Sequence, residues 1–327
     1  MRACASFSLR LGMRLLAPLT ALLTLALLGA GGAAASEILG RNVVAPTLKV
    51  NTKGEALVGY KAAGKSKQVL VWGAVNAIAP TSARAQVAFK IDYAGGWGKY
   101  RKLGYATTFK NACRPYDGPE LAWVVTACKA PDGSYWALQR WQRALPNLGL
   151  TPWKATQSVW ELHLSHWTGP LPVIEAYTDW IYSKRFHHIF GRLTYLGAPV
   201  HGFASTSAGV PLDSFGRNVF LDTLNSAYGA GWKRENSFLA QKPSGAFCYG
   251  FYTHPPYAGY PAGERPMGHG ERYRISAIGP GVTPTVYWEG AGLPAFDKEN
   301  PEHAARELEL NALQRELAGP GGQCVLN

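Results

Sequence analysis

Apolar and polar residues alternate along four segments between residues 160 and 205, with turn residues separating them. The segments are WELHLSHW (Trp160–Trp167), VIEAYTDWIY (173–182), FHHIFGRLTYL (186–196) and PVHGFAS (199–205). A period of two places successive side chains on opposite sides of the chain, which is typical of a β-strand. We therefore predict a four-stranded antiparallel meander across this stretch.

The turn TGPLP sets the first hairpin of the predicted meander. Folding about residues 169–171 places Trp160 opposite Trp180, and Glu161 opposite Asp179. Two carboxylates directly opposite each other repel, so this pair needs a proton, a cation or a basic neighbour.

A two-residue turn at 183–184 sets the register of the second hairpin. This register brings opposite charges together, which stabilises a pair of strands. The predicted pairs are Glu175 with Arg192, Tyr177 with Phe190, Asp179 with His188, and Ile174 with Leu193. By the same reasoning, the return of the fourth segment places His201 beside Thr194 and Phe203 beside Arg192.

The predicted meander has one mostly apolar face and one polar and aromatic face. The apolar face must pack against a second layer of structure. Aromatic rings among charged side chains are costly to expose to water, which favours a ligand-binding role for the other face. The residues predicted to bind a ligand there are His163, Trp167, Glu175, Tyr177, Phe190, Arg192, His201 and Phe203.

A predicted row on that face joins Glu161, Asp179 and His188. Two acids and a histidine can carry general acid–base catalysis, which makes a hydrolase the alternative function. The simpler interpretation is a solvated face on which His188 and Lys184 neutralise the acids. No metal site is expected, because the two histidines of HLSH point to opposite sides of a strand. No cofactor is expected either, since no nucleotide-binding motif occurs.

Most of the remaining chain is also predicted to form short strands. They are expected at 48–50, 56–60, 68–72, 87–93, 121–127, 217–224, 234–240, 246–252, 272–278 and 285–288. The segments 217–224 and 234–240 are expected to pair around a glycine loop at 229–231. The long loop at 254–270 is rich in proline and glycine, and its length indicates a functional segment or a crossover.

Two helices are predicted outside the meander. Residues 135–145 carry apolar side chains at a helical spacing, and Pro146 would end a helix there. The C-terminal helix begins with Asn300 as its cap and Pro301 as its first residue, and Gly319 stops it. Its predicted apolar stripe consists of Ala304, Ala305, Leu308, Ala312, Leu313 and Leu317.

These elements predict a mainly β fold, with antiparallel sheets in a sandwich-like packing and a C-terminal α-helix. The predicted divisions are a signal peptide at 1–35, an N-terminal β segment at 36–93 that can belong to the main domain, a main β domain at 94–299, and the helix with a disulfide-anchored tail at 300–327.

The N-terminus has the features of a secretory signal peptide. Three arginines precede an apolar run at 15–28, and small residues follow, ending in three alanines at 33–35. The alternative is a membrane anchor, which needs about 20 apolar residues. The run is shorter than that, so we expect cleavage near Ala35, export to the extracellular space or cell wall, and no membrane span in the mature chain.

Net charge bears on the partners. Without residues 1–35 the chain has 30 basic and 21 acidic residues, a net charge of +9. This charge favours anionic partners such as cell-wall polymers, acidic polysaccharide or lipid headgroups, although general solubility explains it equally well. No basic run of the kind that follows a nucleic acid backbone occurs, so no nucleic acid partner is expected.

Four cysteines remain after cleavage, and an even number in an exported chain indicates two disulfides. The spacing favours a Cys113–Cys128 and a Cys248–Cys324 pair. A zinc site is the alternative, but no C-x-x-C motif supports it.

Three functions are compatible with these patterns. The first is a secreted or wall-associated protein that binds carbohydrate or another polyhydroxylated ligand on the polar and aromatic face. The second is a secreted hydrolase that uses Glu161, Asp179 and His188, and the third is a structural envelope protein without a small ligand. The row of aromatic rings favours binding over catalysis.

Overall fold

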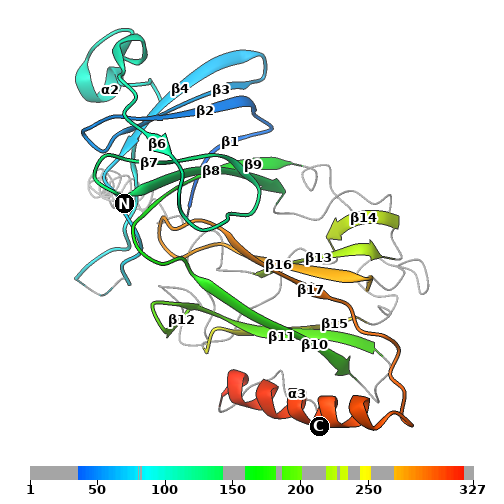
Figure 1. Cartoon of the computed structure of the whole chain (residues 1–327). Coiled ribbons are helices and arrows are strands. Elements are labelled where there is room, and N and C mark those ends of the chain that lie inside the picture. Colours follow the sequence, from blue (N-terminus) through cyan, green and yellow to red (C-terminus); the bar gives the residue numbers. More distant parts are fainter. Residues whose placement is uncertain are drawn as a thin grey trace, which may run out of the picture. The chain divides into compact units, whose positions relative to one another are not determined.

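Four antiparallel sheets and a C-terminal helix make up the fold, as a computed structural model shows (Figure 1). The structure describes residues 36–79, 81, 83–142, 159–181, 186–200, 219–226, 229–234, 244–251 and 269–319. The mainly β class and the sandwich-like packing that the sequence predicts are both confirmed.

The first sheet, called the outer sheet, has the strand order β2–β3–β4–β5. Its strands are β2 (Val44–Val50), β3 (Ala56–Ala62), β4 (Lys65–Trp72) and β5 (Lys90–Asp92). The second, called the β9 sheet, has the order β1–β9–β8–β7–β6. Its strands are β1 (Glu37–Arg41), β9 (Trp160–Trp167), β8 (Tyr135–Gln142), β7 (Val124–Lys129) and β6 (Arg114–Pro115).

The third sheet, called the β13 sheet, has the order β14–β13–β16–β17. Its strands are β14 (Gly229–Arg234), β13 (Val219–Ser226), β16 (Arg272–Ala277) and β17 (Val286–Ala291). The fourth, called the β11 sheet, has β11 (Phe186–Tyr195) at its centre. β11 pairs with β10 (Val173–Ile181), β12 (Ala198–Pro199) and β15 (Ala246–Gly250). The described helical segments are α2 (Trp97–Tyr100), the 3-10 turn η2 (Tyr105–Thr108) and α3 (Pro301–Ala318).

Separate apolar cores stack these sheets in the order outer, β9, β13 and β11, with α3 on the last face (Figure 1). Val58 and Leu162 lie in the core between the outer and β9 sheets. Smaller contacts join the β9 and β13 sheets, and a large core joins the β13 and β11 sheets. The two inner sheets therefore have both faces covered, as layered folds require when strands are apolar on both sides.

The predicted hairpin between β9 and β10 is wrong. β9 pairs with β8 and β1, so Glu161 faces Trp141 and Arg41 instead of Asp179. Trp160 likewise faces Gln142 instead of Trp180. β9 belongs to an inner sheet whose two faces are both buried, and its alternation therefore carries no information about which strand lies beside it.

The predicted β10–β11 hairpin is confirmed in every pair. Glu175 faces Arg192, Tyr177 faces Phe190, Asp179 faces His188, and Ile174 faces Leu193. The next register differs, because Thr194 faces Pro199 instead of His201. The other neighbour of Arg192 is Ala246 of β15 and not Phe203. His201 and Phe203 themselves lie outside the described residues.

Two other predicted elements need correction. The helix expected at 135–145 is strand β8 over its described part, because side chains on both of its faces are buried and their spacing imitates a helical stripe. The expected glycine loop at 229–231 is the start of β14, so the strand paired with β13 begins at Gly229. Of the strand expected at 234–240, only Arg234 is described.

The C-terminal helix begins and ends where the sequence predicts. Asn300 caps it by accepting a hydrogen bond from the backbone N–H of Glu302 at 2.9 Å, and Gly319 ends it with a positive φ of 67°. The predicted apolar stripe is wrong in part, because Leu308 is 72% exposed. The side chains that pack on the β11 sheet side are Leu310, Gln314, Leu317 and Ala318.

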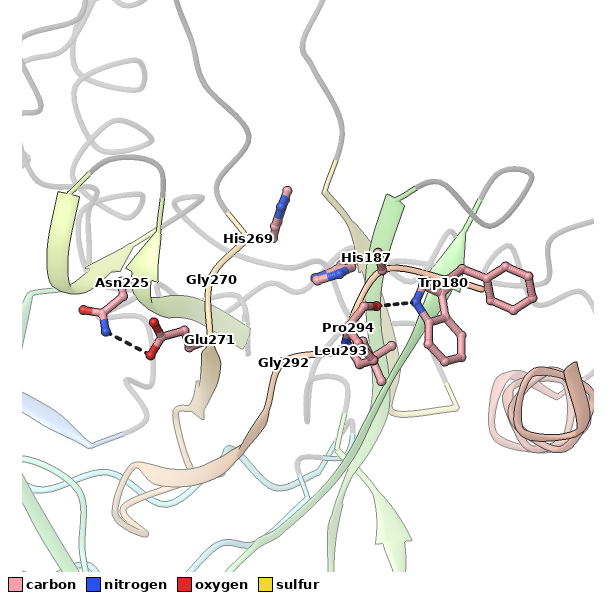
Figure 2. Close-up of a pocket in the computed structure, with 11 residues that line it drawn as sticks. Trp180, His187, Asn225, His269, Gly270, Glu271, Gly292, Leu293 and Pro294 are labelled. Carbon is pink, nitrogen blue, oxygen red and sulfur yellow. Dashed lines mark hydrogen bonds between the residues drawn. The ribbon is translucent and has the colours of Figure 1, made fainter. Parts of the chain in front are cut away.

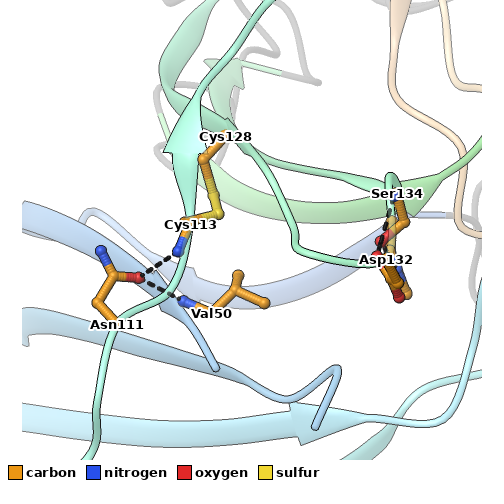
Figure 3. Close-up of a disulfide and its surroundings, with 7 residues drawn as sticks. Val50, Asn111, Cys113, Cys128, Asp132 and Ser134 are labelled. Carbon is orange, nitrogen blue, oxygen red and sulfur yellow. Dashed lines mark hydrogen bonds between the residues drawn. A yellow bond between two sulfur atoms is a disulfide. The ribbon is translucent and has the colours of Figure 1, made fainter. Parts of the chain in front are cut away.

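The predicted Cys113–Cys128 disulfide is present, with a Cα–Cα distance of 5.7 Å, and it joins the residue just before β6 to the end of β7 (Figure 3). Asn111 reinforces the link, since its Oδ1 accepts hydrogen bonds from the backbone N–H groups of Val50 and Cys113. Cys248 is also disulfide-bonded. Cys324 lies outside the described residues, so its pairing with Cys248 stays a prediction.

Candidate functional site

The predicted site residues of β9 lie buried inside the stack. The Glu161 carboxylate is 3.3 Å from the Arg41 Nε and 3.4 Å from the His163 Nε2. Ser36 Oγ lies 3.3 Å from the other ring nitrogen of His163. Trp167 is enclosed by the rings of Tyr116 and Tyr135. These contacts lie within the β9 sheet and its adjoining segments, and the three side chains are almost fully buried.

Asp179 and His188 are brought together, as their predicted pairing requires. The His188 Nδ1 lies 2.7 Å from the Asp179 carboxylate, and Gln314 of α3 lies 3.3 Å from the same nitrogen. Both residues are buried, because α3 covers this face of the β11 sheet. Glu161 lies in the β9 sheet, so the three predicted catalytic residues do not form one site.

The remaining predicted ligand residues sit on β10 and β11. The Tyr177 hydroxyl donates to Glu175 at 2.8 Å, and Arg192 contacts the same carboxylate at 3.2 Å. The hydrogen bond from the Tyr177 hydroxyl to Glu175 raises the pKa of Tyr177. Phe190 is 1% exposed and packs against Leu310 of α3. The predicted aromatic face is therefore divided between two sheets, and α3 covers its β10–β11 part.

A cavity of about 790 Å³, called the histidine cavity, opens where the β11 and β13 sheets meet the chain segments at 269–271 and 292–296 (Figure 2). The side chains that line it and matter for chemistry are Trp180, His187, Asn225, His269, Glu271 and Phe296. They come from five separate segments of the chain, and only the fold brings them together.

Two neutral histidines form the polar side of the histidine cavity. The rings of His187 and His269 lie 4.7 Å apart, centre to centre. Burial, and to a smaller extent the neighbouring His269, lower the pKa of His187 to about 4, and burial also lowers the pKa of His269. The Tyr273 hydroxyl lies 2.6 Å from the His187 Nδ1, which leaves Nε2 as the second polar atom of that ring. The buried Nδ1 of His269 has no hydrogen-bond partner among the described residues.

The other wall of the histidine cavity is aromatic. The Trp180 indole donates from Nε1 to the Pro294 carbonyl at 2.9 Å, which fixes the ring beside the segment at 292–296 (Figure 2). Phe296 stands edge-on to Trp180, with ring centres 5.2 Å apart. At the far end Asn225 donates to the Glu271 carboxylate at 3.1 Å. The cavity thus combines an apolar wall with several hydrogen-bonding groups.

A smaller cavity of about 350 Å³ lies beside Trp72, Asp132 and His166. The His166 Nε2 is 2.9 Å from the Ser134 Oγ, and the Asp132 carboxylate lies 2.6 Å from the same oxygen. Figure 3 shows Asp132 and Ser134 close together in the turn before β8. Ser134 is almost fully buried, so we interpret this chain of hydrogen bonds as a link between the turn and β9.

Sequence reasoning missed His187 and His269 as neighbours. The available signal was the long loop at 254–270, which ends beside His269 and was expected to be functional. Its partner His187 lies on β11 with its side chain on the opposite face from His188, and alternation alone could not show that a cavity lies there.

Comparison with known protein families, curated proteins and solved structures found no match to this chain. Within the described ranges, no three His, Cys, Asp or Glu side chains group so as to hold a metal ion. None of the helices described here is both long and apolar enough to cross a bilayer. The candidate site therefore rests on the geometry of the histidine cavity.

Proposed function

We propose that the protein is an exported binding protein that takes a carbohydrate or another polyhydroxylated ligand in the histidine cavity. The volume of about 790 Å³ falls in the range of small-molecule sites. The signal-like N-terminus and the Cys113–Cys128 disulfide support an oxidising compartment outside the cytoplasm.

The observation that carries this proposal is the Nδ1 atom of His269, which is buried and has no partner among the described residues. A buried polar atom without a hydrogen bond costs about 1–3 kcal/mol. A rotation of the ring toward the cavity would let a ligand hydroxyl supply the missing bond and remove that cost.

The protonation of the cavity favours hydroxyl groups over charged ligands. Because the pKa values of His187 and His269 are lowered, both rings are neutral at pH 7. A neutral imidazole offers one donor and one acceptor, which is the pattern that a hydroxyl group matches. Asn225 adds a side-chain amide, while Trp180 and Phe296 provide an apolar wall for the C–H face of a sugar ring.

A glycan array probed with the secreted, N-terminally sequenced protein tests the proposal, followed by calorimetry with the best glycan. His269→Ala is expected to weaken binding at least about tenfold, since a good hydrogen bond of this kind is worth about 1.4 kcal/mol. Its melting temperature should stay near that of the parent, because the ring lies at a cavity wall.

Glu271→Gln provides a second test, and Glu299→Gln is its matched control. Glu271 lines the cavity, whereas Glu299 is exposed just before α3. The proposal fails if no glycan binds, or if the Glu271 and Glu299 variants bind equally well and His269→Ala has no effect. Release of new reducing ends from a bound glycan would favour the hydrolase alternative.

A further inference from the structure

The positive charge of the chain is concentrated in one part. Residues 36–130 contain 14 lysines and arginines but only 5 acids, a net charge of +9. Residues 131–327 contain 16 of each and are neutral overall. The excess charge of the chain after residue 35 therefore belongs entirely to residues 36–130, which form the outer sheet, its neighbouring loops and the strands β1, β6 and β7 of the β9 sheet.

Few of these cations are neutralised by the protein itself. Among the described residues of this part, ion pairs form only at Arg41, Lys99 and Lys129. The other eleven basic side chains are exposed and have no carboxylate partner there. Such a surface has a positive potential that attracts an anionic partner.

Exposed apolar side chains lie within this basic surface. The segment YAGGWGKYRKLG at residues 93–104, called the Trp97 loop, leaves Leu103 82% exposed and Trp97 42% exposed. Arg101 and Lys102 directly precede Leu103 and are exposed as well. Alternation of basic with aromatic and aliphatic side chains is typical of segments that enter the headgroup region of a membrane.

The Trp97 loop is held in a fixed shape. Both oxygens of the Asp92 carboxylate accept backbone N–H groups, from Ala94 at 2.9 Å and from Gly96 at 3.1 Å and Lys99 at 2.9 Å. Burial opposes ionisation of Asp92, but these N–H groups together lower its pKa below the usual value. These bonds fix the backbone at 94–99, which lowers the backbone ordering cost of the loop on binding.

A buried carboxylate anchors the loop from below. Glu55 lies 2.6 Å from the Lys99 Nζ and accepts hydrogen bonds from the hydroxyls of Tyr100 and Tyr105. Burial raises the pKa of Glu55, but the bonds from Lys99, Tyr100 and their neighbours outweigh it and bring the value to about 2. Lys99 is paired with Glu55 in this contact. Arg101 and Lys102 are therefore the cations beside Leu103 that have no carboxylate partner within the described part of the chain.

We propose that the Trp97 loop docks the protein on the surface of a bilayer that contains anionic lipid. Trp97 and Leu103 enter the interfacial region, while Arg101 and Lys102 contact headgroup phosphates. A lipid surface fits better than an acidic polysaccharide, because an ionic polymer gives no reason to expose Leu103. This surface is separate from the histidine cavity, and the proposal does not depend on what the cavity binds.

Vesicle sedimentation with the purified protein that begins near Ser36 tests the docking. The vesicles are phosphatidylcholine alone, or phosphatidylcholine with about 30% phosphatidylglycerol, which supplies the anionic surface. Binding is expected only to the anionic vesicles and should weaken as salt is raised. Replacing Arg101 and Lys102 together by glutamine should weaken binding about 25-fold, at about fivefold for each charge. Leu103→Ser should weaken it about tenfold.

Matched controls test whether an effect on binding is specific to the Trp97 loop or follows from losing any exposed charge or leucine. Leu308→Ser removes another exposed leucine, on α3, and Lys298→Gln with Arg306→Gln removes two exposed charges. Both controls should bind like the parent protein. Absence of binding to anionic vesicles would overturn the proposal. Binding that depends on Arg101 and Lys102 but not on Leu103, and that dextran sulfate competes away, would also overturn it. That combination would identify a purely ionic partner.

Discussion

The burial of His166 can be tested through the pH dependence of the free energy of unfolding. Its ring stacks on Trp136, with centres 3.8 Å apart, and its Nδ1 donates to the Ala74 carbonyl while Nε2 lies beside Ser134. Burial lowers the pKa of His166 to about 4 from 6.5, although the Ala74 carbonyl and the charge of Asp132 act in the opposite direction. The folded protein therefore holds this ring neutral at pH values where the unfolded chain protonates it.

The sign and size of the effect follow from proton linkage. A lowered pKa in the folded state stabilises the fold fully above pH 6.5, and this contribution is lost as the pH falls through 4. A pKa difference of about 2.5 corresponds to about 3 kcal/mol of unfolding free energy, at about 1.4 kcal/mol per pH unit. We therefore expect acid to destabilise the protein across that window by about this amount through His166 alone.

Urea unfolding of the parent protein and of His166→Phe between pH 7.5 and 4 measures the contribution. Phenylalanine keeps an aromatic ring against Trp136 but cannot bind a proton. The variant should be less stable at pH 7.5, since it loses both hydrogen bonds, yet it should lose about 3 kcal/mol less than the parent on acidification. Parallel pH profiles for the two proteins would refute the reasoning, because His166 would then not be held neutral.

Two further predictions concern stability at neutral pH. Phe190→Ala should lower the free energy of unfolding by about 3–5 kcal/mol, because the ring is buried under α3. A loss below about 1 kcal/mol in urea unfolding would mean that this face is open, as the sequence first suggested. Replacing Cys113 and Cys128 together by serine should lower the unfolding free energy by about 3 kcal/mol, since the bridge closes a loop of 15 residues; an unchanged urea midpoint would show that the bridge does not constrain the unfolded chain.

Local chemistry made some elements predictable from the sequence. The β10–β11 register followed from a short turn and from the attraction of Glu175 to Arg192, both of which act between near neighbours in the chain. The bounds of α3 followed from Asn300 and Gly319, whose preferences are properties of single residues.

The partner of β9 could not be predicted in the same way. Its neighbour β1 is distant in sequence. Its other neighbour, β8, is the strand just before it in the chain, but the apolar spacing of β8 imitates a helix because both of its faces are buried. The alternation of β9 shows that it is a strand but not which strand pairs with it.

The candidate site was predictable only in fragments. The Asp179–His188 contact followed from the register, but its burial depends on Gln314 and the rest of α3, more than a hundred residues later in the chain. The histidine cavity needs β10, β11 and β13 together with the segments at 269–271 and 292–296, and no local pattern joins them.

The pairing of β1 has a consequence for the time at which the protein can fold. Ser36 touches His163, 127 residues later in the chain, and its backbone N–H bonds to the carbonyl of Gly281, later still. During synthesis β1 therefore emerges long before any of its described partners. Closing such long loops slows folding, and an unpaired strand is exposed to association with other chains in the meantime. Of the strands that the structure describes, β1 is thus among the last that can complete its pairing.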